Sequence, residues 1–429
     1  MTKTKFMENP IINNEKISAK GGPASGGKMP RNVVTMGWVS LLNDISSEMI
    51  YPIVPIFLTT ILNAPASAVG LIEGIAESTA SLLKLVSGWL SDRLKKRKIF
   101  VTIGYALSAA SKFLIGMAHI WPFVLFARFL DRFGKGTRTA ARDALILENV
   151  APEQRGRAFG LHRSMDSMGA VIGPLLALLM IFLYQNNFRL IFFLSGIPSV
   201  IGVIILIIFI KEKAKPVFAQ KLQQGEEKLP TANATKPITA NFKFKWKELD
   251  PAFRSFLIIS IIFAIGNSSD AFLILKAKDL GLATTLTVAA YVLYNLTYSL
   301  FSYPAGVVAD KIGSKKVLIA GFWIFALVYL ALGLIKADWW MWILFPTYGI
   351  YIALTDGVSK AYIAAMVPTE KAGTAFGAYL MATGVCVFIA SFGAGLLWKY
   401  VSPSAPFLFG SFCATVAVIW FMFTNPKKI

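Results

Sequence analysis

Acidic side chains recur at four-residue spacing inside segments that are otherwise apolar. Asp44 and Glu48 stand in one such segment, and Glu73 and Glu77 stand in the next. Residues four apart lie side by side on one face of a helix, so each pair predicts two neighbouring carboxylates. A carboxylate held away from water can take up and release a proton. Proton exchange is therefore the first chemistry that the sequence offers.

Further charged residues follow in later apolar segments: Arg128, Asp131 and Arg132 in 121–146, Arg163 and Asp166 in 157–184, and Asp270 in 253–278. An ionisable residue at the centre of a membrane-spanning helix costs about 2.5–3.5 kcal/mol, so each is a functional candidate. Two interpretations stay open. Arginines neutralise carboxylates in a structural network that lets the helices insert, or at least one carboxylate binds a proton in one state and releases it in another.

The composition places these segments in a lipid bilayer. The 429 residues are 55% hydrophobic and 15% charged, and their mean hydropathy is +0.60, whereas soluble domains carry about 25% charged residues. Segments such as 190–210, 317–335 and 404–424 contain no charge and are long enough to cross a hydrocarbon core of roughly 30 Å. We therefore expect an all-α membrane protein with roughly twelve transmembrane helices.

One long polar segment divides these helices into two sets of six. We expect a tail at 1–32, a six-helix bundle at 33–210, a linker at 211–250, a second bundle at 251–424 and a tail at 425–429. Lys and Arg gather in alternate loops, on the side that holds both termini, which predicts that this side is the cytoplasm at a bacterial inner membrane. The Lys and Arg residues of these loops account for the net charge of +20. We therefore expect no nucleic-acid partner.

A short motif recurs at the end of the second helix of each bundle. The first copy reads GWLSDR and the second reads GVVADK. Repeated halves around a central site are typical of secondary transporters, and they predict two bundles related by a pseudo-two-fold axis. The motif residues are Gly88, Asp92, Arg93, Gly306, Asp310 and Lys311.

From about residue 33 onward, these motifs resemble the major facilitator superfamily. The family's loop pattern is Gly-x-Leu-(Ala/Ser)-Asp-Arg-x-Gly-(Arg/Lys)-(Arg/Lys), and 88–97 follows it except for Lys95 in place of the second glycine. The resemblance implies that Asp92 and Arg93 help to close the cytoplasmic side. It also implies that the first, fourth, seventh and tenth helices line a cavity. A basic loop that only sets orientation remains the alternative.

A second motif, Gly169, Gly173 and Pro174, resembles the superfamily's antiporter signature Gly-x-x-x-Gly-Pro. Small residues four apart also let two helices pack closely in any bundle, so a packing role stays open beside the antiport role. The resemblance also implies a proton-coupling arginine followed by a glycine four residues later. Here the glycine after Arg128 is Gly134, so either Arg128 or Arg132 can take that role.

The expected function is secondary active transport. The sequence has neither the Gly-x-x-x-x-Gly-Lys-(Ser/Thr) motif for ATP nor a cluster of metal ligands, so we expect no enzyme, no metal and no cofactor, with a proton gradient as the energy source. We expect a monomer that moves a small organic solute outward by proton-coupled antiport. Two alternatives remain: proton-coupled symport of a charged metabolite or siderophore-like chelate, and a membrane sensor that binds without conducting.

Overall fold

The computed structural model describes residues 29–94, 97–150, 154–210, 250–367 and 369–424. Over these ranges the chain forms helices and short connections, with no strand. The expected tails and linker lie almost wholly outside the described residues, so their boundaries stay predictions.

The first bundle is built from α1 (Arg31–Ile50), α2 (Ile53–Thr60), α3 (Ala66–Leu94), α4 (Arg97–Met117), α5 (Trp121–Glu148), α6 (Arg155–Leu183) and α7 (Phe188–Phe209). α1 and α2 together make a single span, Arg31–Thr60. The interruption lies at Pro52, which has no backbone N–H to continue the helical hydrogen bonds. The first bundle therefore has six spans.

The second bundle is built from α9 (Pro251–Gly266), α10 (Ala271–Asp279), α11 (Thr284–Ile312), α12 (Ser314–Leu334), the short 3-10 helix η3 (Asp338–Trp340), α13 (Met341–Met366), α14 (Thr369–Tyr400) and α15 (Ala405–Phe423). α9 and α10 form one broken span, Pro251–Asp279, so this bundle also has six. The prediction of twelve spans in two bundles is confirmed for the described part of the chain. The breaks in the first and seventh spans were not predicted.

Eight of the spans are long enough and apolar enough to cross a membrane, judged by length and composition alone. The other four long helices, α3, α5, α11 and α13, are less apolar by this measure. Polar and charged residues are tolerated at membrane depth where they face the protein interior or a water-filled cavity. These four helices are therefore the ones to search for a site.

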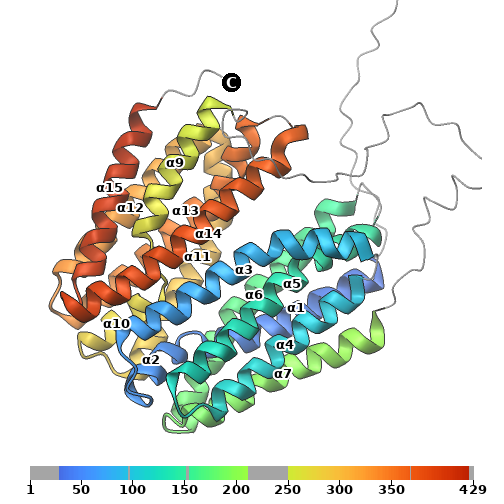
Figure 1. Cartoon of the computed structure of the whole chain (residues 1–429), viewed down its shortest axis with the longest axis horizontal. Coiled ribbons are helices and arrows are strands. Elements are labelled where there is room, and N and C mark those ends of the chain that lie inside the picture. Colours follow the sequence, from blue (N-terminus) through green and yellow to red (C-terminus); the bar gives the residue numbers. More distant parts are fainter. Residues whose placement is uncertain (1–28, 95–96, 151–153, 211–249, 368, 425–429) are drawn as a thin grey trace, which may run out of the picture.

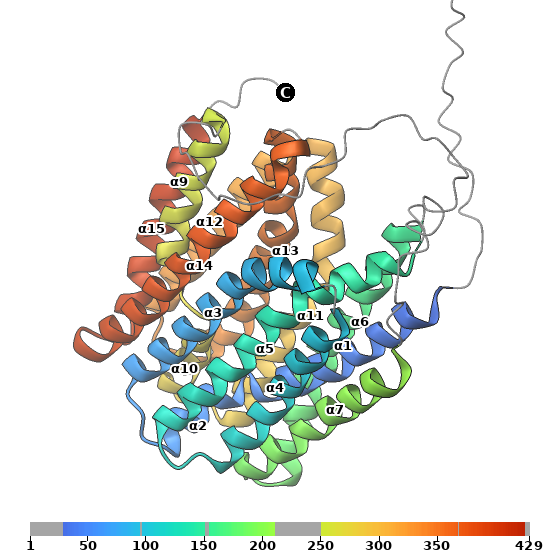
Figure 2. The ribbon, with the colours of Figure 1, turned by 45° about the vertical axis from the view of Figure 1, so that its right-hand side comes forward.

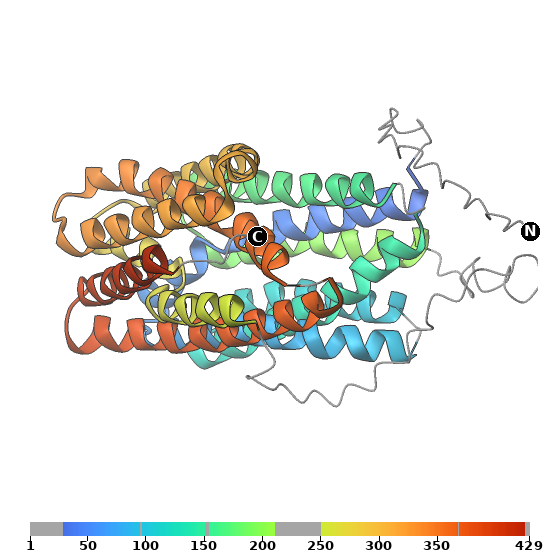
Figure 3. The ribbon, with the colours of Figure 1, turned by 90° about the horizontal axis from the view of Figure 1, so that it is seen from above.

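The bundles contact each other through two helix pairs, α3 with α14 and α6 with α11, and α2 lies against α10 at one end. From that end the bundles diverge (Figure 1, Figure 2). Figure 3 shows that the long helices of both bundles run in the same general direction when seen from above. The end where they diverge carries Arg31, Arg97, Arg157, Lys311 and Lys316, and we call it the basic end.

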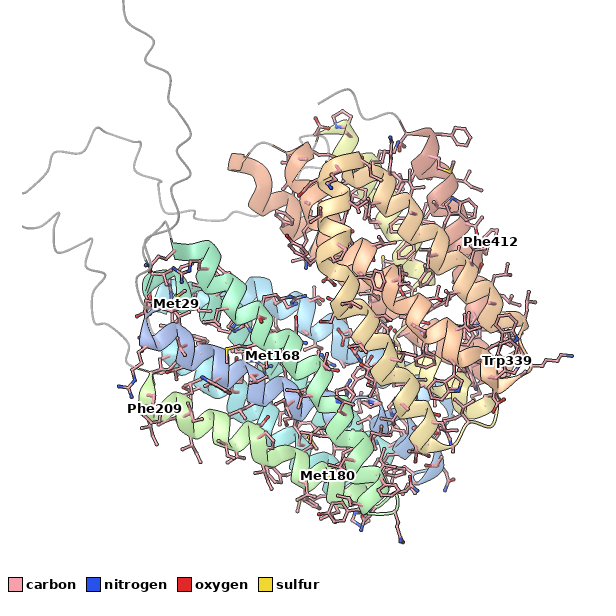
Figure 4. All side chains as sticks on the ribbon, turned by 180° about the vertical axis from the view of Figure 1, so that it is seen from behind. Met29, Met168, Met180, Phe209, Trp339 and Phe412 are labelled. Atoms are coloured by element: carbon pink, nitrogen blue, oxygen red, sulfur yellow. The ribbon has the colours of Figure 1, made fainter. Side chains whose placement is uncertain are left out.

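Large apolar side chains cover the outside of both bundles. Phe209, Trp339 and Phe412, labelled in Figure 4, are 41%, 52% and 66% exposed. A soluble monomer rarely exposes apolar surface of this extent. The outer helix faces are therefore suited to contact with lipid tails.

Candidate functional site

A charged cavity of 410 Å³ lies between the bundles. Its walls come from α1, α3, α5 and α6 of the first bundle and from α11 and α13 of the second, so all four of the less apolar helices contribute. This volume lies in the range of small-molecule sites, about 300–1,000 Å³. The charged lining residues are Asp44, Glu48, Lys84, Lys135, Arg138, Arg142, Arg163, Asp166, Asp356 and Lys360.

Other predicted site residues lie behind the cavity wall, beginning with a buried ion pair between α3 and α5. Arg128 Nη2 donates to both carboxylate oxygens of Glu73 at 2.7 and 2.8 Å, and Nε donates to Oε1 at 3.2 Å. Both side chains are 2% exposed. A dry, bidentate pair of this kind is among the stronger charge-assisted interactions, and its geometry favours the structural interpretation.

Asp131 is neutralised by Lys112 of α4, a residue that the sequence analysis did not select. Lys112 Nζ donates to Asp131 Oδ1 at 2.9 Å and to Ser47 Oγ at 3.1 Å, and the lysine is fully buried. A buried ammonium needs a carboxylate nearby. The sequence signal that could have identified it is a single lysine inside an otherwise apolar span.

Arg132 and Glu77 complete this network. Arg132 Nη2 lies 3.2 Å from Glu77 Oε1, and Arg132 Nε lies 3.8 Å from Asp131 Oδ2. The two candidate arginines therefore pair with different acids, since Arg128 contacts Glu73. Five predicted residues on α3 and α5, joined by the lysine of α4, form one ion-pair cluster.

Asp44 and Asp166 are in a different situation, because neither has an ion pair with a described lysine or arginine. Asp44 makes no hydrogen bond within the described residues, although it faces the cavity. Asp166 Oδ2 lies 3.4 Å from His162 Nδ1, while its Oδ1 is buried without a hydrogen-bond partner. Both acids line the same cavity, Asp44 from α1 and Asp166 from α6, without a lysine or arginine partner among the described residues.

The glycines of the predicted antiporter signature hold α6 against the acidic face of α1. A Cβ on Gly169 would lie 2.8 Å from Asp44 Cβ, and a Cβ on Gly173 would lie 2.6 Å from Glu48 Cβ. No real side chain fits at such distances. Pro174, also buried, follows in α6. This geometry confirms close packing of the two helices and leaves the antiport role as a prediction.

Two contacts connect the bundles across the cavity. The Tyr291 hydroxyl of α11 donates to Glu48 Oε2 at 3.3 Å. Arg163, which is 64% exposed, donates to the Tyr298 hydroxyl at 3.2 Å and lies 3.6 Å from Asp356 Oδ2. Glu48 and Arg163 are therefore bridging residues in this conformation.

Asp270 lies in the break between α9 and α10. It accepts hydrogen bonds from the hydroxyls of Tyr294 at 3.0 Å and Tyr348 at 2.7 Å. The seventh span contributes no residue to the cavity within the described part of the chain, whereas the first, fourth and tenth do. The resemblance implied that the first, fourth, seventh and tenth spans line the cavity, and three of these four do. The second, fifth and eighth spans line it as well.

The predicted gating residues can be placed only in part. Gly88, Asp92 and Arg93 lie in α3, but their side chains are outside the described residues, so their role stays a prediction. Asp310 and Lys311 are exposed at the end of α11, shortly after Gly306. Both motifs therefore lie toward the basic end.

A family model described as Major Facilitator Superfamily matches residues 36–293 and 255–429. The chain belongs to the major facilitator superfamily. It is 36% identical over 404 residues to the uncharacterized MFS-type transporter MJ1317 of Methanocaldococcus jannaschii, an alignment that covers 92% of this chain and 95% of that one. Over 153 residues it is 31% identical to the multidrug resistance protein MdtH of Salmonella arizonae, covering 36% of this chain and 37% of MdtH.

Solved transporters of the superfamily share the fold. The nucleoside transporter NupG matches with a TM-score of 0.70 at 13% identity, over 91% of this chain and 98% of that chain. A D-xylose-proton symporter matches with a TM-score of 0.70 at 15% identity, over 92% and 97%. This superfamily member is therefore a multi-pass membrane transporter and not an enzyme, as the sequence predicted.

Proposed function

We propose that this superfamily member is a proton-coupled secondary transporter that exports a small organic solute by antiport. The observation that carries the proposal is the contrast among its acids. Glu73, Glu77 and Asp131 each contact an arginine or lysine, whereas Asp44 and Asp166 share the cavity wall without one.

Two carboxylates that share a cavity wall without a lysine or arginine partner are suited to bind a proton. Like charges at short range disfavour the state in which both are ionised, and a proton shared between them removes that repulsion. A cationic group of a solute would remove it equally well. Proton and solute would then occupy the site in turn, and this mutual exclusion is the linkage that antiport requires.

The placement of the cavity supports alternating access. Its residues come from the parts of α5, α6 and α13 nearer the basic end, for example Arg142, Arg163 and Lys360. The positive-inside rule favours the cytoplasm for that end, which would put both termini inside a bacterial inner membrane. In this proposal the structure is an inward-facing state of a monomer, and rocking of the bundles would open the other end.

Two further observations support export. The Gly169 and Gly173 pair matches the antiporter signature by resemblance and packs at Asp44 and Glu48. A relative over about a third of the chain is named a multidrug resistance protein. Proton-coupled symport of a charged metabolite or siderophore-like chelate is the second candidate, because the cavity lining holds six basic residues beside four acidic ones.

Proton movement in reconstituted vesicles tests the proposal. Vesicles that enclose the dye pyranine would be exposed in turn to organic acids, amines, amphoteric compounds and siderophores. Antiport predicts that a transported solute drives protons in the opposite direction. Protons that move with the solute would establish the symporter instead, and solute binding without any flux would establish the sensor.

Variants then locate the coupling site. Asp44→Asn and Asp166→Asn should lose gradient-driven accumulation and retain energy-independent exchange. Asp338→Asn, at an exposed aspartate in η3 far from the cavity, is the matched control and should behave as wild type.

A further inference from the structure

We propose that the solute is a zwitterion, with an ammonium group that binds at Asp44 and Asp166 and an acidic group that binds at Lys84 and Lys135. The inference rests on the proposed function only in taking the central cavity as the transport site. It adds the chemical class of the solute, which follows from the charges that the protein leaves unpaired on each side of that cavity.

Most charged residues of the cavity already have partners within the protein. Asp356 Oδ1 accepts from Lys360 at 3.1 Å, and its Oδ2 accepts from Tyr298 and lies near Arg163. Arg142 donates to Asp143 at 2.9 Å. Arg138 donates to Ser108 at 2.6 Å and stacks on a tyrosine ring. Of these groups only Arg138 lacks an acidic partner, and the serine hydroxyl and the ring hold its guanidinium in place.

The acidic pole, Asp44 and Asp166, has no lysine or arginine partner among the described residues, and its one close basic group is His162, 3.4 Å from Asp166 Oδ2. The two residues come from α1 and α6, and the close packing of these helices at Gly169 fixes the backbone of Asp44 against α6. One buried oxygen of Asp166 has no hydrogen-bond partner. An ammonium group has three donors and a positive charge, so it would satisfy both carboxylates.

The basic pole, Lys84 and Lys135, is unpaired as well. Neither lysine has a hydrogen bond or an ion pair within the described residues, and both line the cavity. Glu77, which precedes Lys84 in α3, is engaged with Arg132 at 3.2 Å. Two ammonium groups that repel each other form a site for an anion such as a carboxylate or phosphate.

One small molecule can reach both poles. Lys84 of α3, Lys135 of α5, Asp44 of α1 and Asp166 of α6 line the same cavity of 410 Å³. A neutral solute would leave both poles unpaired, and a simple amine would satisfy only the acidic pole. A zwitterion satisfies both, and its ammonium group competes with the proton for the same carboxylates.

Two isosteric sets of probes test this inference by binding. The rigid set is 4-(aminomethyl)benzoate, 4-methylbenzoate, 4-methylbenzylammonium and 4-methylbenzyl alcohol, and the flexible set is 6-aminohexanoate, hexanoate, hexylammonium and hexanol. The full-length protein in detergent would be titrated with each probe at constant ionic strength, and Kd would be read from the shift in Tm. In at least one set, the zwitterion should bind more tightly than its three isosteres.

Variants assign each end of the probe. The double variant Lys84→Gln/Lys135→Gln should weaken zwitterion binding at least about tenfold, the equivalent of one modest ion pair, and leave the ammonium isostere unaffected. Asp44→Asn should remove the advantage of the zwitterion over the carboxylate isostere. Lys336→Gln, an exposed lysine at the opposite end, is the matched control and should change nothing.

The inference is overturned if neither zwitterion binds better than its isosteres, or if the advantage survives in the double lysine variant. Binding in detergent needs no proton gradient. Selective zwitterion binding without proton flux in vesicles would therefore contradict antiport and leave the inference standing. Antiport of a solute with a single charge would support the proposed function and overturn the zwitterion inference.

Discussion

Two sets of acidic residues in the first bundle have opposite environments. Glu73, Glu77 and Asp131 lie between α3, α4 and α5, each 2.7 to 3.2 Å from a basic nitrogen. Asp44 and Asp166 lie between α1 and α6 at the cavity, without an arginine or lysine partner among the described residues. All of them are ionisable residues within apolar helices. In our proposal, the partner of a carboxylate, more than its depth, separates a structural role from a transport role.

The largest expected effect comes from breaking the paired set. Arg128→Met should destabilise the protein by about 3–5 kcal/mol, because it leaves the buried Glu73 carboxylate without a partner. Protein yield and thermal unfolding in detergent would measure the loss. The double variant Glu73→Gln/Arg128→Met should recover much of it. Wild-type stability of Arg128→Met alone would contradict the structural role of this pair.

A second large effect, on activity, is expected at the contact that positions the unpaired set. Gly173→Leu should abolish transport, because even a Cβ would lie 2.6 Å from Glu48 Cβ and 2.8 Å from the Ile45 carbonyl oxygen. Gly173→Ala should give an intermediate loss. Gly160→Leu, in the same helix with no atom near its added Cβ, is the control. Equal activity of the two leucine variants would show that close packing of α1 and α6 is dispensable.

The third prediction separates the two sets directly. Asp44→Asn should give wild-type yield, since it removes a charge that has no ion-pair partner, yet it should abolish gradient-driven accumulation. Glu77→Gln should instead lower yield, because Arg132 loses its closer partner and keeps only Asp131 at 3.8 Å. Parallel assays of protein yield and uphill transport would measure both. If Asp44→Asn and Asp166→Asn both retain uphill transport, the coupling site lies elsewhere, with Glu48 and Asp270 as the next candidates.

The sequence predicted the number of spans and the list of charged residues, because hydropathy and side-chain type are local properties. It did not predict which charges pair. Residues four apart share a helix face, but the neighbour that this face meets depends on how each helix is rotated in the bundle. Arg128 and Arg132 therefore remained interchangeable until the structure placed them on different acids. For the same reason the sequence did not indicate that Lys112 pairs with Asp131.

The smallest effect is expected at Arg163. Like Arg128, it is an arginine in a spanning helix that lies near a carboxylate, but its side chain is exposed. Its guanidinium lies 3.6 Å from Asp356, and the two side chains are 64% and 40% exposed. Because exposed ion pairs contribute about 0–1 kcal/mol, Arg163→Gln should change the free energy of unfolding by no more than that. The difference should disappear in about 1 M salt, where screening acts within roughly 3 Å. Thermal unfolding at low and high salt measures both. A loss as large as that of Arg128→Met would mean that exposure does not weaken the pair, and burial would then no longer explain why the Arg128 pair is structural.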